Sequence, residues 1–320
     1  MKLQFTQLTG ALVALGLAGV ANAAALNDAQ ENNTAQDEPG LSFAAEYLLV
    51  QPVSDGLEAR GADFIGQIIP GENLQTKLNN SAFRLEGLYK FGDGRDVKID
   101  WTHLIGKNIT GNFELTDRPD SAPNDFLSTK GKYKFDAVNL ELGQTLYASE
   151  RTSYRIFGGV QLARIGTDSS VTYNTFTRNN DGDFAPNEPV ALESYKSSVF
   201  AVGPRLGAQG KVGLIDNFSI TGTIAASLLV GDLKHEVTTP TSATETTTVK
   251  TTERAIIPAL ETRVGLLYDL PSFDGNDVSV ELGYQAASYS NAIKSNISGT
   301  RENFAYQGPY LSVRWAGDIG

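Results

Sequence analysis

The chain has 320 residues, a formal net charge of −11 at pH 7 and no cysteine. The excess of acidic residues argues against nucleic-acid binding, which needs a basic face. The absence of cysteine excludes disulfides and an N-terminal lipid attached to cysteine. The mean hydropathy is slightly negative, but a membrane barrel shows apolar side chains to lipid only at every second position, so composition does not separate a soluble chain from a barrel.

Residues 1–23 predict a secretion signal. Lys2 supplies a positive start, Leu8–Val20 is an apolar run, and Ala21–Ala23 fits a cleavage site. The apolar run is short for a membrane-spanning helix, which needs about 20 residues. The polar and acidic stretch that follows, residues 24–40, predicts a flexible periplasmic leader.

The rest of the chain, residues 41–316, alternates between apolar and polar or small residues. The clearest run is Phe218–Val230, where Phe218, Ile220 and Leu228 share one face and serines and threonines share the other. A period of two indicates a β-strand. The run of about 13 residues exceeds the usual ~5–6 of globular strands and suits a tilted strand that crosses a bilayer, which needs roughly 9–11.

Ten segments show this alternation. They are residues 41–53, 81–91, 97–105, 132–147, 154–165, 199–209, 218–230, 254–270, 278–289 and 302–315. In the fourth segment the phase slips between Phe135 and Val138, which predicts a β-bulge near Asp136–Val138. Weak segments near Ile65 and Tyr173 leave eight or twelve strands as alternatives to ten.

The connections between these segments alternate between long and short. The two most distinctive long ones are Thr167–Lys196, whose Ser170–Thr177 part could extend the hairpin beyond the membrane, and Lys234–Glu253. The second is rich in threonine, and we expect it to be a mobile loop. Outer-membrane barrels have short periplasmic turns and longer extracellular loops. We therefore predict an all-β fold, a closed antiparallel transmembrane barrel of about ten strands, followed by a short tail at residues 317–320. A soluble β-sandwich is the alternative, although sandwiches seldom sort their loops in this way.

Aromatic residues fall at both ends of the expected strands, as the amphipathic rings of interfacial girdles do. Those at the short-turn ends are Tyr89, Phe91, Tyr147, Tyr154, Phe218, Tyr268 and Trp315, and those nearer the long loops are Trp101, Tyr133 and Phe200.

Several short motifs resemble the Legionella-type pore-forming outer-membrane protein family. They are Val202-Gly203-Pro204-Arg205-Leu206-Gly207, Ala225–Gly231, Ile257–Leu260 with Val264–Leu266, Leu282–Gln285 and Gln307–Leu311. The resemblance runs from about Leu41 to the C-terminus. It implies an outer-membrane barrel described as pore-forming, and it supplies no catalytic residues. The chain departs from the pattern at its end, where Trp315 is followed by five further residues instead of being terminal.

The charged residues on the inward phase are the candidate pore-lining residues. They are Glu46, Arg84, Glu86, Lys98, Asp100, Glu141, Arg155, Arg205, Glu261, Arg263 and Glu281. In a wide pore such charges would set ion selectivity, whereas in a narrow barrel they would pair and fill the interior. Both readings remain open. The near balance of five basic and six acidic residues predicts weak ion selectivity.

We expect no catalytic site, no metal site and no cofactor. His235, near Asp232 and Glu236 in a predicted loop, could activate water in a hydrolase, but a solvated loop histidine is the simpler interpretation. His103 alternates with Trp101 and is expected at the membrane interface. Residues 179–183 resemble the start of a calcium loop but lack its later glycine and glutamate.

The predicted function is porin-like passive diffusion of small solutes through a narrow polar lumen, constricted by Arg84, Arg155, Arg205 and Arg263. The alternative is a structural or surface-binding barrel with a filled lumen that acts through its extracellular loops. The expected location is the outer membrane of a Gram-negative bacterium. The expected partners are outer-membrane lipid, the barrel assembly machinery during insertion, and small solutes.

Overall fold

The computed structural model of the chain describes residues 39–54, 80–106, 109–114, 126–149, 151–174, 176–178, 184–186, 190–240, 245–272, 276–294 and 301–318. The predicted signal peptide, nearly all of the leader, the calcium-like residues 179–183 and the last two residues of the predicted tail lie outside the described residues. Within the described ranges, no helix has the length and apolar character to cross a membrane.

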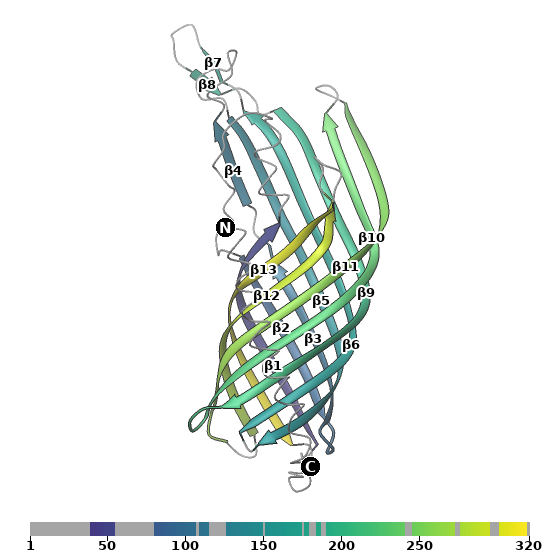
Figure 1. Cartoon of the computed structure of the whole chain (residues 1–320). Helices are drawn as coiled ribbons and strands as arrows, with labels where there is room; N and C mark the ends of the chain where they lie inside the picture. The colour runs from purple at the N-terminus through teal and green to yellow at the C-terminus, as the bar shows by residue number, and fades with distance from the viewer. Residues whose placement is uncertain are drawn as a thin grey trace.

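Ten antiparallel strands form a closed barrel (Figure 1). They are β1 (Gly40–Ser54), β2 (Asn80–Lys90), β3 (Arg95–Ile105), β5 (Phe126–Ser149), β6 (Thr152–Asn174), β9 (Val190–Gly213), β10 (Phe218–Pro240), β11 (Thr246–Asp269), β12 (Asn276–Lys294) and β13 (Arg301–Asp318). The first strand pairs with the last, and the pairing of β3 with β5 closes the ring. Closure leaves no unpaired strand edge in the hydrocarbon, where water cannot satisfy it. The predicted fold and the count of ten strands are confirmed.

Three short strands lie outside the ring. β4 (Ile109–Glu114) adds to the upper part of β5, while β7 (Phe176–Arg178) pairs only with β8 (Phe184–Pro186).

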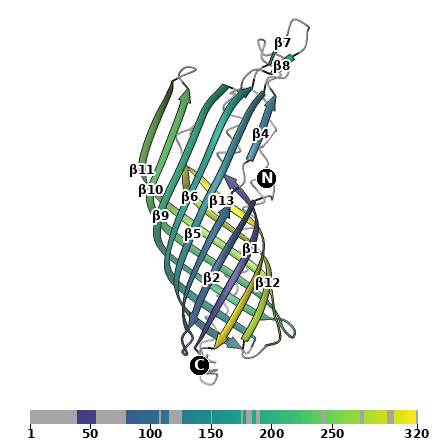
Figure 2. The same ribbon diagram turned by 180° about the vertical axis from the view of Figure 1, so that it is seen from behind.

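Five neighbouring strands extend far beyond the others. β5, β6, β9, β10 and β11 each have 23 or 24 residues, whereas β2 and β3 have 11. The longer strands have about twice the residues that a bilayer crossing needs. Their upper halves form one curved sheet, which we call the outer wall and which rises past the ends of β1, β2, β12 and β13 (Figures 1 and 2).

The outer wall corrects the loop predicted at Lys234–Glu253 and extends the hairpin at Thr167–Lys196, as the alternative for Ser170–Thr177 expected. Much of Thr167–Lys196 is strand, because β6 continues to Asn174 and β9 begins at Val190; most of Lys234–Glu253 is strand in β10 and β11. Threonine is a strong strand former, and threonines that face each other across strands stabilise the pairing. The Thr238 and Thr248 hydroxyl oxygens lie 3.2 Å apart. The Thr-rich composition is therefore a strand signal here and not that of a mobile loop.

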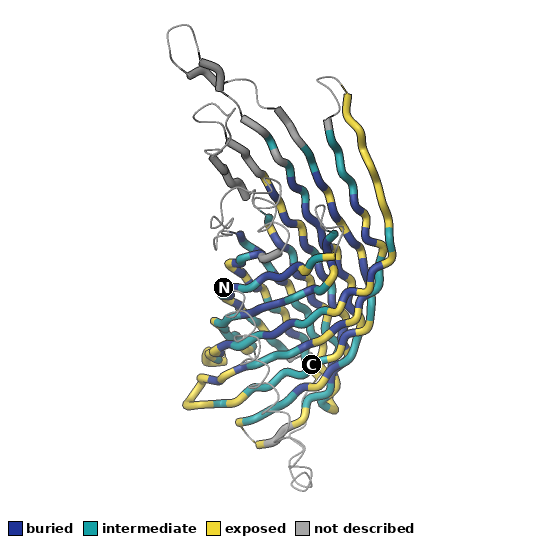
Figure 3. The backbone as a smooth tube through the Cα atoms, turned by 45° about the horizontal axis from the view of Figure 1, so that its top comes forward, coloured by how far each residue is buried: buried dark blue, intermediate teal, exposed yellow. Residues whose placement is uncertain are grey.

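The predicted alternation of faces is confirmed along the barrel (Figure 3). Leu142 is 65 % exposed toward the lipid, and Glu141 beside it is fully buried in the interior. The predicted bulge near Asp136–Val138 is wrong, because β5 pairs there with both β3 and β6 without a register shift. The slip of phase arises because Tyr133 and Phe135 point inward and are buried, so Tyr133 is not part of the outer girdle.

The remaining aromatic girdles agree with prediction where the side chains are described. Phe91, Phe218 and Trp315 are exposed near the short turns, and Trp101 and Phe200 are exposed nearer the outer wall. The tight turn between β2 and β3 places Gly94 in the left-handed region, at φ 77°. Beside it, hydrogen bonds donated by Arg95 lower the pKa of the solvent-exposed Asp93 carboxyl.

Two Gly-Pro pairs interrupt the hydrogen-bonded ladders at sites of close backbone approach. At Gly308-Pro309 the pairing of β13 with β1 skips from Tyr310 to Gln307, and Gly203-Pro204 has the same effect between β9 and β10. Proline has no N–H to donate to a ladder. A Cβ atom on Gly308 would lie 1.8 Å from the Leu49 carbonyl oxygen. The glycine therefore lets the neighbouring strand approach where the ladder is broken.

The substitution Gly308→Ala should destabilise the barrel, because the added methyl group would force the backbone of β1 to shift. Overpacking of this kind costs about 1–3 kcal/mol. The matched control is Gly222→Ala, where the nearest heavy atom to the new Cβ is a carbonyl oxygen 3.9 Å away. Urea unfolding of both variants in lipid vesicles measures the difference, and equal unfolding free energies would contradict this account.

Candidate functional site

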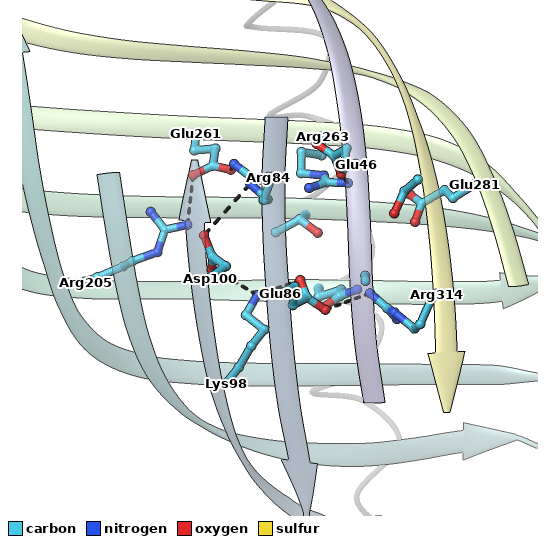
Figure 4. Close-up of a pocket in the computed structure, with 14 residues that line it drawn as sticks. Glu46, Arg84, Glu86, Lys98, Asp100, Arg205, Glu261, Arg263, Glu281 and Arg314 are labelled. Atoms are coloured by element: carbon cyan, nitrogen blue, oxygen red, sulfur yellow. Dashed lines mark hydrogen bonds and ion pairs between the residues drawn. The ribbon is translucent and has the colours of Figure 1, made fainter. Parts of the chain in front are cut away.

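The inward-pointing charged side chains gather in the half of the lumen nearer the short periplasmic turns, and Figure 4 shows ten of them around one pocket. Each comes from a strand position between two lipid-facing residues, so the alternation that exposes apolar side chains outside carries the charges inside. All eleven residues predicted to line a pore lie there: Glu46 on β1, Arg84 and Glu86 on β2, Lys98 and Asp100 on β3, Glu141 on β5, Arg155 on β6, Arg205 on β9, Glu261 and Arg263 on β11, and Glu281 on β12. We call this set, together with Asp96 and Arg314, the ion-pair layer.

The centre of the ion-pair layer is a chain of paired charges across the lumen. Arg84 Nη2 donates to Glu261 Oε1 at 2.6 Å, so β2 is tied to β11. The other oxygen of Glu261 accepts from Arg205 Nη2 at 2.9 Å, and Arg205 Nε donates to Glu141 at 3.0 Å. These four side chains are at most 5 % exposed. Pairing is required at such burial, because an unpaired charge in the interior is strongly destabilising.

Glu141 joins this chain to a second group of charges. Its carboxylate also contacts Arg155 Nη1 and Lys98 Nζ, each at 3.1 Å, so three cations surround one fully buried anion. Arg155 in turn forms a two-pronged interaction with Asp96, with distances of 2.6 and 2.8 Å. A forked arginine–carboxylate pair fixes the orientation of both groups.

The side of the layer nearer β1 and β13 holds further pairs. Arg263 Nη2 lies 2.6 Å from Glu46 Oε2, and its guanidinium carbon lies 4.3 Å from the centre of the Tyr310 ring. Arg314 donates to Glu86 at 2.9 Å. Here too, charges from different strands neutralise each other inside the barrel.

Sequence analysis missed Asp96 and Arg314. Asp96 lies just before the predicted segment 97–105, whereas β3 already begins at Arg95. Arg314 sits between the outward-facing Val313 and Trp315, so the alternation itself contained the signal.

Glu281 is held differently from the other carboxylates. It accepts hydrogen bonds from the hydroxyl groups of Tyr310 at 2.5 Å and Thr221 at 2.7 Å. Among the residues that the structure describes, no basic group lies within ion-pair distance of it.

Two cavities lie in the periplasmic half of the described lumen. A cavity of about 530 Å³, lined by residues such as Lys211, Thr221 and Asp269, opens at the short-turn end. A second cavity of about 30 Å³ lies within the ion-pair layer and has room for about two water molecules. Glu281 and Arg314 line both cavities. We call the larger cavity the periplasmic vestibule.

Above the ion-pair layer, toward the long connections, the inward residues become apolar. We call this region the apolar septum; its large side chains are Leu48, Val50, Leu104, Tyr133, Phe135, Ile165, Leu229, Leu233, Ile257, Tyr289, Ile293, Phe304 and Tyr306. Each is at most 3 % exposed. The rings of Phe135, Phe304 and Tyr306 contact one another with centroids 5.2–6.3 Å apart. The described part of the lumen is thus filled at this level by packed side chains.

The end of the β12–β13 hairpin helps to close the septum. A register shift between Tyr289 and Ile293, with Asn291 in the left-handed region, bends β12. Its end reaches strands that are not its neighbours in the sheet at this height. The Lys294 backbone N–H donates to Ser197 Oγ on β9 at 3.0 Å, and Lys294 Nζ lies 3.5 Å from Glu253 on β11. Ile293 is thereby buried within the septum.

Neither histidine supports the hydrolase alternative. His235 lies on β10 and is 8 % exposed, so its expected place in a solvated loop is wrong. Asp232 is three residues away and faces the opposite side of the strand, while Glu236 pairs with Lys250. His103 lies on the lipid-facing phase, and its Nδ1 is 2.7 Å from Asp136 Oδ1. The described ranges contain no cluster of three or more acidic or histidine side chains suited to a metal ion.

A closed ring of ten tilted strands, with apolar side chains outside, aromatic girdles and a charged interior, defines an outer-membrane β-barrel. The chain belongs to the family described as Legionella pneumophila major outer membrane protein precursor, whose model matches residues 34–317. The predicted family and the outer-membrane location are thereby confirmed.

Solved structures with a similar overall shape are distant in sequence. The outer membrane protease OmpT from Escherichia coli is 11 % identical with a TM-score of 0.48, covering 90 % of this chain and 99 % of that one. The translocator domain of the autotransporter NalP from Neisseria meningitidis is 12 % identical with a TM-score of 0.35, covering 95 % and 97 %. A FadL homologue from Pseudomonas aeruginosa is 8 % identical with a TM-score of 0.32, covering 89 % and 91 %. At this level of likeness they carry no argument about activity. A comparison with curated proteins finds no match.

Removal of Glu261 should destabilise the barrel more than any single change at its surface. The substitution Glu261→Leu leaves the buried guanidinium groups of Arg84 and Arg205 without their shared carboxylate, and breaking a buried pair costs about 3–5 kcal/mol. The control is Arg95→Gln, which breaks a solvent-exposed pair with Asp93 and should have little effect. Urea unfolding in vesicles measures both variants. A Glu261→Leu barrel as stable as the control would show that the pairing is dispensable.

Proposed function

We propose that this protein is a sealed outer-membrane barrel whose lumen does not conduct and whose function is exerted at its extracellular surface. The observation that carries the proposal is the apolar septum. A hydrated ion that entered this layer would exchange its water for mainly aliphatic and aromatic side chains, with only a few tyrosine hydroxyl groups as polar partners, and removing an ion from water in this way is strongly unfavourable. Hydrophobic constrictions in channels stop conduction for the same reason, by excluding water.

The ion-pair layer supports the same proposal. The four arginines expected to constrict a polar pore are each engaged with carboxylates: Arg84 with Glu261, Arg155 with Asp96, Arg205 with Glu141, and Arg263 with Glu46. A permeating ion would have to separate such pairs. Ten strands also form a barrel close in size to the eight-stranded ones, which side chains fill. Porin-like diffusion of small solutes through a narrow polar lumen therefore fits this geometry less well than the filled-lumen alternative.

A surface role is supported by the outer wall. A bilayer crossing does not require strands of 23 or 24 residues, yet five neighbouring strands have that length. Continuous ladders, such as that from Phe218–Tyr268 up to Pro240–Thr246, hold the upper halves on the barrel below. The barrel would thus act as a rigid base for a structural or surface-binding scaffold outside the membrane.

Gated diffusion is the second candidate function, and the bent end of the β12–β13 hairpin favours it. Among the described residues of this end, Lys294 and Arg301 make the polar contacts with the facing wall. Glu253 Oε1 forms ion pairs with Lys294 Nζ, at 3.5 Å, and with Arg301 Nε, at 3.4 Å. Outward movement of this end would withdraw Ile293 from the septum and shorten the closed part of the lumen.

Single-channel recording in planar bilayers distinguishes the candidates. The sealed barrel predicts no conductance steps for the folded protein or for Glu253→Ala, which removes the contact shared by Lys294 and Arg301. It predicts steps for the triple substitution Tyr133→Ala, Phe135→Ala and Phe304→Ala, which hollows the septum. The control, Trp101→Ala with Phe200→Ala, alters lipid-facing rings and should stay silent. Steps from Glu253→Ala alone would favour gated diffusion, and steps from the unmodified protein would contradict both closed-lumen readings.

A further inference from the structure

A row of outward-facing aliphatic side chains crosses the lipid-facing side of the outer wall, one row below the exposed ring of Phe200. Across β5, β6, β9, β10 and β11, the hydrogen-bonded register aligns Val138, Leu162, Val202, Val230 and Ile256 on the outward face. Ile256 is 56 % exposed and Val202 46 %. Apolar side chains exposed to this extent mark the part of the barrel in contact with hydrocarbon.

Taken together, the three outward rows immediately above hold more basic than acidic residues. We call six of the basic residues the basic belt: Arg164 and Arg254 in the first row, Lys134 and Lys234 in the second, and Lys132 and Lys196 in the third. All six are exposed. Three acidic residues share these rows with them, Asp136, Asp168 and Asp232, while Lys250 and Glu236 pair with each other. Six basic and three acidic side chains leave a local charge of +3 in a chain whose net charge is −11.

Three of the six belt residues do not form an ion pair with a described carboxylate. Lys134 Nζ lies 2.5 Å from Asp168 Oδ2. Within the part of the chain that the structure describes, Lys132, Lys196 and Lys234 have no carboxylate within 4.0 Å. Neighbouring strands are about 4.8 Å apart and successive outward residues on one strand about 6.6 Å apart, so adjacent cations of the belt can share one anionic group.

We propose that the basic belt binds the phosphate groups of the glycolipid in the outer leaflet of the outer membrane. Its position carries the argument, because the belt begins one row above the aligned aliphatic side chains, at the level of the exposed ring of Phe200, and interfacial aromatic rings lie at the level of the lipid headgroups. A lysine or arginine bound to phosphate makes a charge-assisted hydrogen bond, and basic side chains near an anionic membrane surface strengthen the attachment of a protein to it. The belt therefore fixes how high the outer wall stands above the bilayer.

Lipid binding by the full-length folded barrel tests the proposal. The barrel is placed in phosphatidylcholine nanodiscs, and the probe is diphosphorylated lipid A, compared with the same lipid after removal of its phosphates. The test variant carries Lys132→Gln, Lys196→Gln and Lys234→Gln. The control carries Lys90→Gln, Arg95→Gln and Arg151→Gln, the same loss of charge at exposed positions of the periplasmic end.

The test variant should bind diphosphorylated lipid A roughly tenfold or more weakly than the unmodified protein, and the control should bind it unchanged. The dephosphorylated lipid should bind all three proteins equally. A variant with arginine at the three test positions should keep the affinity, and comparison of migration before and after boiling shows that each barrel is folded. Equal lipid A binding by the test variant, or an equal loss in the control, would overturn the proposal. A soluble sulfated polysaccharide serves as a second anionic probe. If the test variant lost binding to this polysaccharide but kept its binding to lipid A, the proposal would also be overturned.

Discussion

Hydrocarbon offers no hydrogen bonds to a polypeptide backbone. This constraint determines first the closure of the sheet and then the pairing of side chains in the lumen. The strands must form a ring, and the pairing of β3 with β5 completes it. A ring of ten strands is narrow, so side chains from opposite walls meet inside. Arg84 on β2 thus reaches Glu261 on β11, 177 positions away in the chain. The pairing of charges in the lumen follows from closure, because charges brought together in a narrow space must neutralise one another.

The interior is divided into two parts with different chemistry. Toward the periplasm, carboxylates and guanidinium groups surround a water-sized cavity that adjoins the open vestibule. Toward the outside, aliphatic and aromatic side chains such as Leu229, Ile257 and Phe304 pack against one another. At this height several strands are apolar on both faces, toward lipid and toward the lumen. The interior of the barrel at this height is therefore packed like the hydrophobic core of a soluble protein. This packing gives the outer wall a rigid base.

Alternation in the sequence was enough to predict the ring, its ten strands and the inward position of every candidate charge. It failed where both faces are apolar. The prediction took apolar residues to face the lipid and polar residues to face the lumen. Tyr133 and Phe135 are apolar but face the lumen, so they suggested a slip of phase and a bulge. The pairing of Arg155 with Asp96 could not be predicted either, since it depends on the register between strands. Threonine-rich composition in β10 and β11 suggested a loop, although threonine also favours strands.

The accessibility of the lumen from each side tests the account most directly, and a chain without cysteine makes the measurement simple. Single cysteines are introduced at Thr221 in the vestibule, Leu229 in the septum and Thr252 on the outer wall, and are challenged with a membrane-impermeant thiol reagent. The account predicts that Thr252→Cys reacts in intact cells, that Thr221→Cys reacts only when the reagent reaches the periplasm, and that Leu229→Cys reacts from neither side. Reaction of Thr221→Cys from outside intact cells would mean an open path through the septum and would contradict the account.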